Sequence, residues 1–254
     1  AEMRIRDSLE RESTEMYYRL LNCGFRLAAT GGTDNFSDVW LDPSGGTART
    51  YVHIDGAPPL TFSGWLDGVR EEKTFGTNGP LLFLNVGHGR LSPGTMLEPG
   101  EEFALESTDD TTFDISLAVT SLAPLDRVEI IVNGSVAHTW GEADFVGHNA
   151  NEVWNLSTTI ELPGSGWIAA RASGPPSEYV GDAFPFAATS PVYVVRDGHN
   201  YTSVEDAQFL LETINILWDR VESRDACNTD AERRAYSEAI GQARAIFQHI
   251  IDGL

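Results

Sequence analysis

Hydrophobic and polar residues change their spacing twice along this chain of 254 residues. Helical and strand-like spacings alternate up to about residue 90, short strand-like runs follow, and helical spacing returns near residue 198. We therefore expect an α+β protein of several domains. Its expected parts are a βα segment over 1–90, an antiparallel β-sandwich over 91–197 and a helical hairpin over 198–254.

The first part predicts two helices and three strands. Apolar residues at helical spacing predict helices over 8–23 and 61–73. Gly24 is placed to end the first helix, and Thr61 or Ser63 is placed to cap the second. Short apolar runs predict strands over 25–30, 50–54 and 81–86. Because strands and helices alternate here, we expect the parallel pairing of βαβ units, as in a parallel sheet or barrel.

The second part predicts a stack of short strands. Its apolar runs are bounded by Gly, Pro and Asn, and the dipeptide Asn133-Gly134 is a strong signal for a hairpin turn. Strands are expected over 113–119, 126–132, 136–140, 154–162, 166–172 and 191–195. Several short strands within roughly 100 residues are typical of an immunoglobulin-like sandwich.

The third part predicts two amphipathic helices. One apolar stripe covers 204–221, a second covers 235–250, and the polar residues 225–230 lie between them. This pattern predicts an antiparallel helical hairpin, with Trp218 and Phe247 as core side chains.

The charge of the chain argues against two classes of partner. It carries 38 acidic and 17 basic residues, a formal net charge of −21, and such a surface repels phosphate backbones and anionic membranes. We therefore expect no nucleic-acid partner and no membrane partner. The first residues contain no apolar signal core and no apolar run reaches the length of a membrane span, so we expect a soluble chain without a signal peptide or transmembrane segment.

Asp34 is the clearest candidate for chemistry. It follows a predicted strand and the run Gly31-Gly32-Thr33, and in α/β barrels the carboxyl end of a strand is where metal ligands and catalytic groups lie. Asp38 follows close behind. The residues alone leave two interpretations open. The two aspartates are hard oxygen ligands of a divalent metal, or they are solvated carboxylates of an Asx-type turn.

Other candidate patterns are weak. The histidines show neither HExxH nor HxH spacing, and each alone is more typical of a surface or hairpin residue; they are His53, His88, His138, His148, His199 and His249. No serine lies in a Gly-x-Ser-x-Gly elbow. Cys23 and Cys227 are too few for a disulfide framework or a cysteine zinc site, and we expect Cys23 to be a buried free thiol. The residues therefore assign no catalytic group and no organic cofactor.

The chain also resembles a known family. The run from Glu15 to Asp34, EMYYRLLNCGFRLAATGGTD, resembles the closing section of the CehA/McbA-type metallohydrolases of the PHP (polymerase and histidinol phosphatase) superfamily. Later stretches are also similar to that family, namely RTYV at 49–52, GTNGP at 76–80, GWIAARASG at 166–174 and TSPVYV at 189–194. The similarity covers about residues 13–197.

The resemblance implies a distorted βα barrel that holds two or three metal ions, followed by a β-sandwich. The implied chemistry is metal-assisted hydrolysis of an ester, carbamate or phosphoester. Asp34 matches the metal-binding Asp of the family's Gly-Ser/Thr-Asp-x-His motif, whereas Phe36 stands where that motif has its His. The family's earlier ligands, among them a His-x-His pair, have no counterpart, because no histidine precedes His53.

The resemblance therefore implies the C-terminal part of a larger enzyme with an incomplete site for Zn²⁺, Mn²⁺ or Mg²⁺. One carboxylate binds such a metal weakly, so we expect the isolated chain to be inactive. An incomplete barrel leaves strand edges unpaired. We therefore expect either an N-terminal segment or partner chain that completes the barrel, or self-association.

Two further hypotheses stay open. In one, the chain is a non-catalytic module whose sandwich binds a polypeptide or a saccharide through exposed aromatic residues, with Trp140, Trp154, Trp167 and Tyr179 as candidates. A core role is the alternative for these four side chains. In the other, the terminal helical hairpin forms a dimer.

Overall fold

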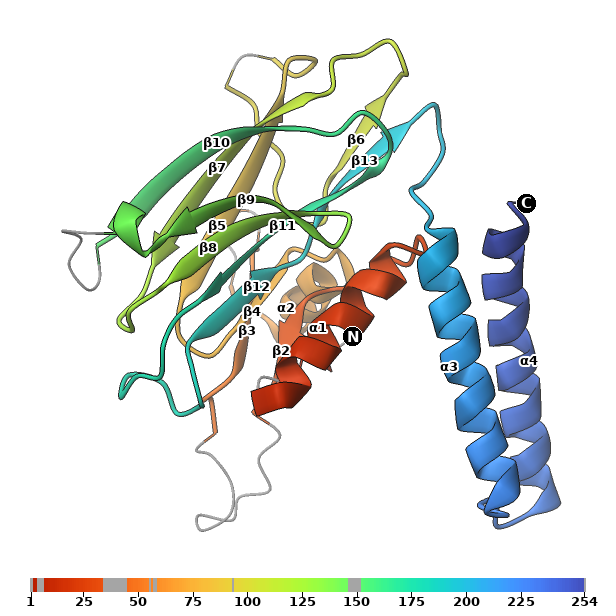
Figure 1. Ribbon diagram of the computed structural model, residues 1–254. Helices are drawn as coiled ribbons and strands as arrows, with labels where there is room; N and C mark the ends of the chain where they lie inside the picture. The colour runs from red at the N-terminus through yellow and green to blue at the C-terminus, as the bar shows by residue number, and fades with distance from the viewer. Residues whose placement is uncertain are drawn as a thin grey trace. The chain divides into compact units, whose positions relative to one another are not determined.

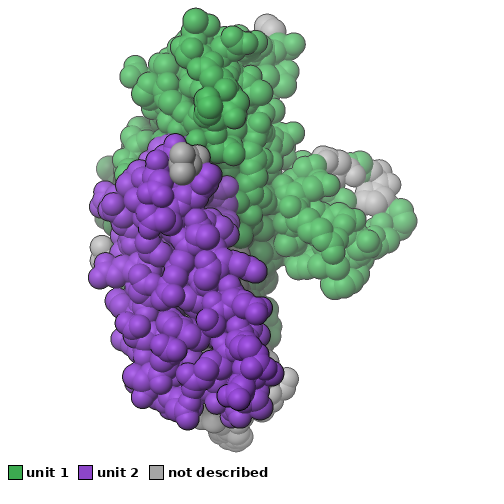
Figure 2. Space-filling view, turned by 90° about the vertical axis from the view of Figure 1, so that its right-hand side faces the viewer, with its two compact units in different colours: residues 1–18, 26–200 green, residues 19–25, 201–254 purple. Residues whose placement is uncertain are grey.

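The computed structural model describes residues 2–3, 7–33, 45–54, 56, 59–92, 94–145 and 152–253. Its helices and strands are shown in Figure 1. The chain divides into two compact units, coloured separately in Figure 2: unit 1 contains residues 1–18 and 26–200, and unit 2 contains residues 19–25 and 201–254.

Unit 1 contains a three-stranded antiparallel sheet of order β10-β7-β5. Its strands are β5 (Leu81–His88), β7 (Thr112–Thr120) and β10 (Trp154–Glu161). Alternate residues of β7 are buried, as in a sheet that packs one face on a core. These strands confirm the predicted ones over 81–86, 113–119 and 154–162, apart from small shifts of their ends.

The second sheet of unit 1 has eight strands among the described residues. Six follow the path β3-β4-β12-β11-β13-β6, while β8 pairs with β11 and with β9 beside that path. The strands are β3 (Arg49–Val52), β4 (Thr74–Thr77), β6 (Glu102–Leu105), β8 (Arg127–Val132), β9 (Ser135–Gly141), β11 (Gly166–Ser173), β12 (Phe186–Thr189) and β13 (Val192–Arg196). Their pairings are antiparallel except for β13 with β6, which is parallel.

The core of unit 1 is built from both sheets. Leu84 and Leu117 of the smaller sheet belong to the same buried cluster as Ile130 and Ile168 of the larger one. Full burial of such a side chain stabilises a fold by roughly 1.5–3 kcal/mol relative to exposure. The antiparallel β-sandwich in the expected fold class is therefore confirmed.

The turn between β8 and β9 is the one that Asn133-Gly134 predicted. Both residues have positive φ, 50° and 81°, which matches the type I′ turn that favours this dipeptide. The Trp167 N–H donates to Asn133 Oδ1 at 2.9 Å. The turn residue thus also binds the start of β11.

A short βα segment precedes the sandwich in unit 1. β1 (Glu2–Met3) pairs in parallel with β2 (Thr30–Gly31), and α1 (Asp7–Leu21) lies between them in the chain. This is the pairing of a βαβ unit, although the sequence predicted no strand at β1 and placed the strand before the glycine pair over 25–30. The buried Tyr17 hydroxyl donates to the Leu27 carbonyl at 2.8 Å, so the helix holds the chain that returns toward β2.

The parallel pairing expected for the next strands is wrong. β3 pairs antiparallel with β4, and β5 pairs antiparallel with β7. The helix α2 (Phe62–Arg70) is capped by Thr61, as predicted. It does not form a crossover connection, because the chain after the helix returns to the end of β3, where the His53 N–H donates to the Lys73 carbonyl at 2.8 Å. The strand after α2 is the buried β4, which has little apolar signal, and β5 joins the other sheet.

Unit 2 contains the predicted helical pair. Its helices are α3 (Val204–Ser223) and α4 (Asp230–Asp252). Ser203 and Thr229 are their N-caps, each accepting a backbone N–H bond with its side-chain oxygen. Phe247 is buried as expected, whereas Trp218 is only half-buried. None of the helices in the described part of the chain is long and apolar enough to cross a bilayer.

The last turn of α1 also belongs to unit 2, and it ends at Gly24 as predicted. The Gly24 N–H donates to the Leu21 carbonyl at 3.0 Å, and the Phe25 N–H donates to the Leu20 carbonyl at 3.2 Å. With the φ of Gly24 at 80°, these bonds form a Schellman motif. Cys23 is a free thiol, and burial raises its pKa to about 11.

Candidate functional site

Asp34 and Asp38, the two expected metal ligands, lie outside the described residues, as does Phe36. The structure does describe the chain up to Thr33, including β2 and the glycine pair. It therefore defines how the backbone is held immediately before Asp34.

Two buried hydroxyls hold Ala29, which is itself buried. The Ala29 N–H donates to Ser190 Oγ at 2.8 Å, and Thr74 Oγ1 donates to the Ala29 carbonyl at 2.7 Å. The two hydroxyl oxygens are 2.7 Å apart. Because Thr74 gives its hydrogen to Ala29, Ser190 donates to Thr74, and every polar group in this circuit is satisfied.

Two further hydroxyls hold the chain beyond Ala29. The Gly31 N–H donates to Thr50 Oγ1 at 3.0 Å, and the same hydroxyl donates back to the Gly31 carbonyl at 2.9 Å. Thr33 Oγ1 accepts from the Gly46 N–H at 3.0 Å and donates to the Ala48 carbonyl at 3.1 Å. We call Thr33, Thr50, Thr74 and Ser190 the hydroxyl seam.

Two glycines allow the close approach of backbones along the hydroxyl seam. A Cβ on Gly76 would lie 3.0 Å from the Gly31 nitrogen, and a Cβ on Gly31 would lie 3.0 Å from the Arg49 carbonyl oxygen. Both distances are tighter than ordinary contacts, so larger residues would push β2 away from β3 and β4. Fixed strands and satisfied hydroxyls together preorganise the backbone that leads to Asp34.

The described residues do not fit a complete metal site. None of them form a group of three or more His, Cys, Asp or Glu side chains that could hold a metal ion. His88 Nε2 lies 2.8 Å from the Asp110 carbonyl, and His53 pairs with Glu98. His148 lies outside the described residues. Within the described residues, the structure therefore shows no ligand set to which Asp34 would be added.

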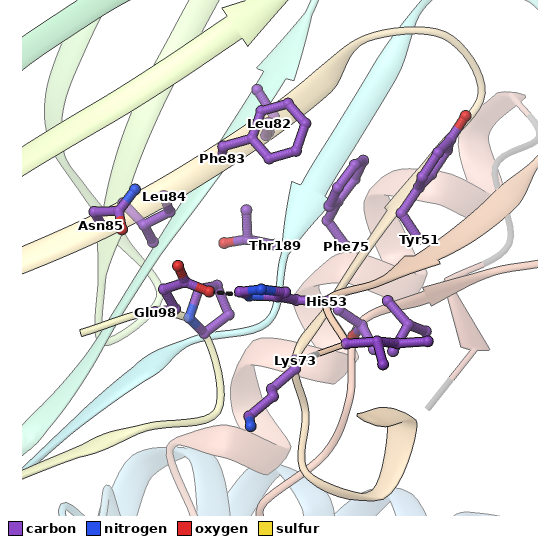
Figure 3. Close-up of a pocket in the computed structure, with 14 residues that line it drawn as sticks. Tyr51, His53, Lys73, Phe75, Leu82, Phe83, Leu84, Asn85, Glu98 and Thr189 are labelled. Carbon is purple, nitrogen blue, oxygen red and sulfur yellow. Dashed lines mark hydrogen bonds and ion pairs between the residues drawn. The ribbon is translucent and has the colours of Figure 1, made fainter. Parts of the chain in front are cut away.

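A cavity of about 330 Å³ is a second candidate site in unit 1 (Figure 3). Aromatic rings form much of its lining. The Tyr51 and Phe75 rings stack with centroids 5.0 Å apart and an interplanar angle of 2°, and Phe83 meets Phe75 edge-on at 5.8 Å. Tyr51 is 39% exposed and Phe83 is 51% exposed, so both present ring surface to an incoming molecule. We call this cavity the aromatic pocket.

Polar side chains line the rest of the aromatic pocket. His53 pairs with Glu98 inside it, and Lys73 Nζ lies 3.1 Å from a carboxylate oxygen of Glu71. Thr189 is 2% exposed, and its Oγ1 accepts the Ala170 N–H at 3.0 Å. Figure 3 shows Thr189 between the Phe75 and Phe83 rings on one side and the His53–Glu98 pair on the other.

Sequence reasoning missed the aromatic pocket. Tyr51 and Phe83 lie on strands, and an outward aromatic residue on a strand is not by itself a signal for a site. The signal is the pairing of β3 with β4 and the position of β5, which bring residues from five segments of the chain together. The alternation in 81–88 does identify Phe83 as outward-facing between the buried Leu82 and Leu84.

The tryptophans proposed as a binding surface are buried. Trp140 is 8% exposed, Trp154 is 6% exposed and Trp167 is 1% exposed. The exposed interpretation is therefore wrong for these three, because each ring packs inside unit 1 against other apolar groups, and their core role is confirmed. Tyr179, at 58% exposed, is the member of that set that lies on the surface.

Comparisons with known proteins assign this chain to no family. No protein-family model matches the chain, and no curated protein matches its sequence. Among solved structures, the CARDB domain of a Pyrococcus furiosus protein aligns at 16% identity over 46% of this chain and 95% of that domain, with a TM-score of 0.27. A lytic polysaccharide monooxygenase of Jonesia denitrificans aligns at 17% identity over 59% of this chain and 78% of that one, also at a TM-score of 0.27. Scores this low support no argument about function.

Proposed function

We propose that this chain is the C-terminal portion of a PHP-type metal-dependent hydrolase, with Asp34 as one metal ligand, and that it is inactive without the ligands that the family carries on earlier strands. The observation that carries the proposal is the position of the stretches that resemble CehA/McbA-type enzymes. Far apart in the sequence, they lie on neighbouring strands of one sheet, and two of them contribute hydroxyls that hold the backbone before Asp34.

The family-like stretches lie on neighbouring strands of the larger sheet. RTYV forms β3, GTNGP contains the end of β4, GWIAARASG contains β11, and TSPVYV spans the end of β12 and the start of β13. These strands are neighbours in the order β3-β4-β12-β11-β13. Thr50 and Ser190 of the hydroxyl seam lie within two of these stretches.

The parallel pair β1–β2 also supports the proposal. Two strands of two residues each bury too little surface to be stable alone. A barrel that continues this pair would bury its open edge and would place further ligands beside the carboxyl end of β2. Those ligands would come from an N-terminal segment, a partner chain or a second copy of this chain.

A divalent metal bound at such a site polarises a scissile carbonyl or phosphoryl group and activates water. In this chain the proposed role of the hydroxyl seam is to fix the backbone from which Asp34 projects. We derive no catalytic step from the described residues, because they do not fit a complete metal site.

The proposal is tested by metal-dependent hydrolysis. We expect this chain, supplied with Zn²⁺, Mn²⁺ or Mg²⁺, to hydrolyse p-nitrophenyl acetate, an aryl carbamate and p-nitrophenyl phosphate no faster than the metal alone. In the protein translated from the complete reading frame, we expect metal-dependent turnover, and Asp34→Asn should lower kcat by at least about 100-fold, as the loss of several kcal/mol of metal-derived stabilisation requires.

The matched control is Asp38→Asn. An effect as large as that of Asp34→Asn would make Asp38 a second ligand, whereas unchanged kcat would assign it to the turn. The proposal fails if the complete reading frame adds no histidine-bearing segment, if Asp34→Asn leaves turnover unchanged, or if this chain alone turns over substrate at the rate of the complete protein.

A further inference from the structure

We propose that the aromatic pocket binds an uncharged saccharide. This inference is independent of the proposed hydrolase function, since it rests on residues of the sandwich and not on Asp34. It assigns a binding role to the side chains of Tyr51, Phe83, Asn85 and Glu98, which line the pocket.

The aromatic surface is suited to the apolar face of a sugar ring. A pyranose presents C–H groups on its faces and hydroxyl groups at its edge, so it packs a face on an aromatic ring and directs its edge toward polar partners. Tyr51 and Phe83 are both exposed at the pocket, and the buried Phe75 packs against each of them. Phe75 thus holds the two outer rings in place before a ligand arrives.

The polar groups supply both donors and acceptors for sugar hydroxyls. Glu98 is an acceptor and Asn85 is both donor and acceptor, and both line the pocket together with the aromatic rings. Thr189 already accepts one backbone bond, and its hydroxyl hydrogen has no acceptor among the described residues. A ligand hydroxyl that accepts this hydrogen would satisfy it at the floor of the pocket.

Charge argues against an anionic ligand. The basic side chains that line the pocket, His53 and Lys73, are each paired with a carboxylate. The chain as a whole carries a net charge of −21, which repels anions at long range. A purely apolar aromatic ligand would fill the ring surface but would bury the Asn85 amide without a hydrogen-bond partner, which costs free energy. A neutral saccharide carries no negative charge and also offers hydroxyl groups to the polar side chains of the pocket.

Titration of this chain with neutral disaccharides tests the proposal. We expect cellobiose, maltose, xylobiose or diacetylchitobiose to bind in isothermal titration at millimolar or lower dissociation constants. Tyr51→Ala and Phe83→Ala should each weaken binding at least about tenfold, because each removes a ring that faces the ligand. Both side chains are exposed, so the variants are expected to fold, and circular dichroism checks this.

Tyr179→Ala is the control, since it removes an exposed aromatic side chain that does not line the pocket. We expect it to leave binding unchanged. Three results would each overturn the proposal: no binding of any neutral saccharide on a glycan array or by titration, equal loss of binding in Tyr179→Ala, or binding of indole with no saccharide competing for it. None of these results bears on hydrolysis, so failure here is separable from failure of the hydrolase proposal.

Discussion

The sandwich core and the hydroxyl seam lie in the same unit but are held together by different interactions. The core is a continuous set of aliphatic and aromatic side chains contributed by both sheets. The hydroxyl seam holds the backbone from Ala29 to Thr33 through directed hydrogen bonds from Ser and Thr side chains. The first depends on how much apolar surface is buried, and the second on where individual oxygens lie.

Because of this difference, the core mainly determines the stability of unit 1, whereas the hydroxyl seam mainly determines where the backbone before Asp34 lies. A lost methyl group in the core weakens the whole unit, because the cavity is shared by many neighbours. A lost hydroxyl in the seam frees a short stretch of backbone, because each bond serves one or two peptide groups. We therefore expect core substitutions to act on global unfolding and seam substitutions to act on the placement of the residues before Asp34.

The largest effect is expected for Leu117→Ala in the core. Leu117 is fully buried on β7, and truncation of such a side chain costs about 2–5 kcal/mol of unfolding free energy. Urea unfolding followed by tryptophan fluorescence measures the loss in unit 1. Val136→Ala, at an exposed position of β9, is the control and should change stability little.

The next effect is expected for Thr74→Val in the hydroxyl seam. The substitution keeps the shape of the side chain but leaves the Ala29 carbonyl without its donor, at a cost of about 1–3 kcal/mol. Hydrogen exchange should rise at residues 29–31 by more than the global loss of stability explains. Thr159→Val on the exposed face of β10 should leave that exchange unaltered. If Leu117→Ala raised hydrogen exchange at residues 29–31 more than in the rest of unit 1, the proposed division between a core that controls global stability and a seam that controls local placement would be wrong.

A smaller effect is expected for Thr50→Val. Thr50 is only half-buried, so water replaces part of the lost bonding to Gly31, and the cost should be about 0.5–1.5 kcal/mol. Exchange of the Gly31 amide is the sensitive measurement. If Thr50→Val cost as much unfolding free energy as Thr74→Val, burial would not determine how much each hydroxyl of the seam contributes to stability.

The smallest and most specific effect concerns Glu72, a buried polar group outside the hydroxyl seam. Its carboxylate accepts a hydrogen bond from the Tyr193 hydroxyl. Burial raises the pKa of Glu72 above its ordinary value of 4.5, although the bond from Tyr193 acts in the opposite direction. The folded state therefore holds the proton more tightly than the unfolded state, and this contribution to stability, present below pH 4.5, is lost as pH rises through the folded pKa.

Glu72→Gln removes this titration while keeping a hydrogen-bond acceptor for Tyr193. We expect the variant to lose less stability than the native chain as pH rises from 4.5 toward neutrality. Glu161→Gln makes the same change of net charge at an exposed position of β10, so it corrects for the general effect of the acidic surface. Parallel stability curves for Glu72→Gln and Glu161→Gln would contradict the prediction.

Local signals in the sequence predicted many individual elements. Gly24, Thr61 and Asn133-Gly134 ended, capped or turned the chain where predicted, because each acts through its own backbone geometry or a contact a few residues away. The two terminal helices were likewise visible as apolar stripes. Strands of only four residues, such as β4 and β6, escaped this kind of reasoning.

For the candidate sites, in contrast, most of the residues involved were not predictable from local signals in the sequence. Asp34 was singled out from the sequence, since it follows a predicted strand and two glycines within a family-like run, and its role stays a prediction. Thr74 and Ser190 were not singled out, because a threonine and a serine 116 residues apart carry no mutual signal until strands bring them together. The aromatic pocket was missed for the same reason.

By itself, the sequence determined the acidic surface, the helical pair, the hairpin turn and the sandwich class, because period, turn chemistry and charge are local properties. Tertiary structure alone decided that β3 pairs antiparallel with β4 and β5 with β7. It alone also decided that the three tryptophans are buried and that four hydroxyls bind the backbone before Asp34 or near it. Strand pairing joins residues that are far apart in the chain. Alternating apolar and polar residues identify a strand but not the strand it pairs with, and a single hydroxyl does not indicate which group it will bind.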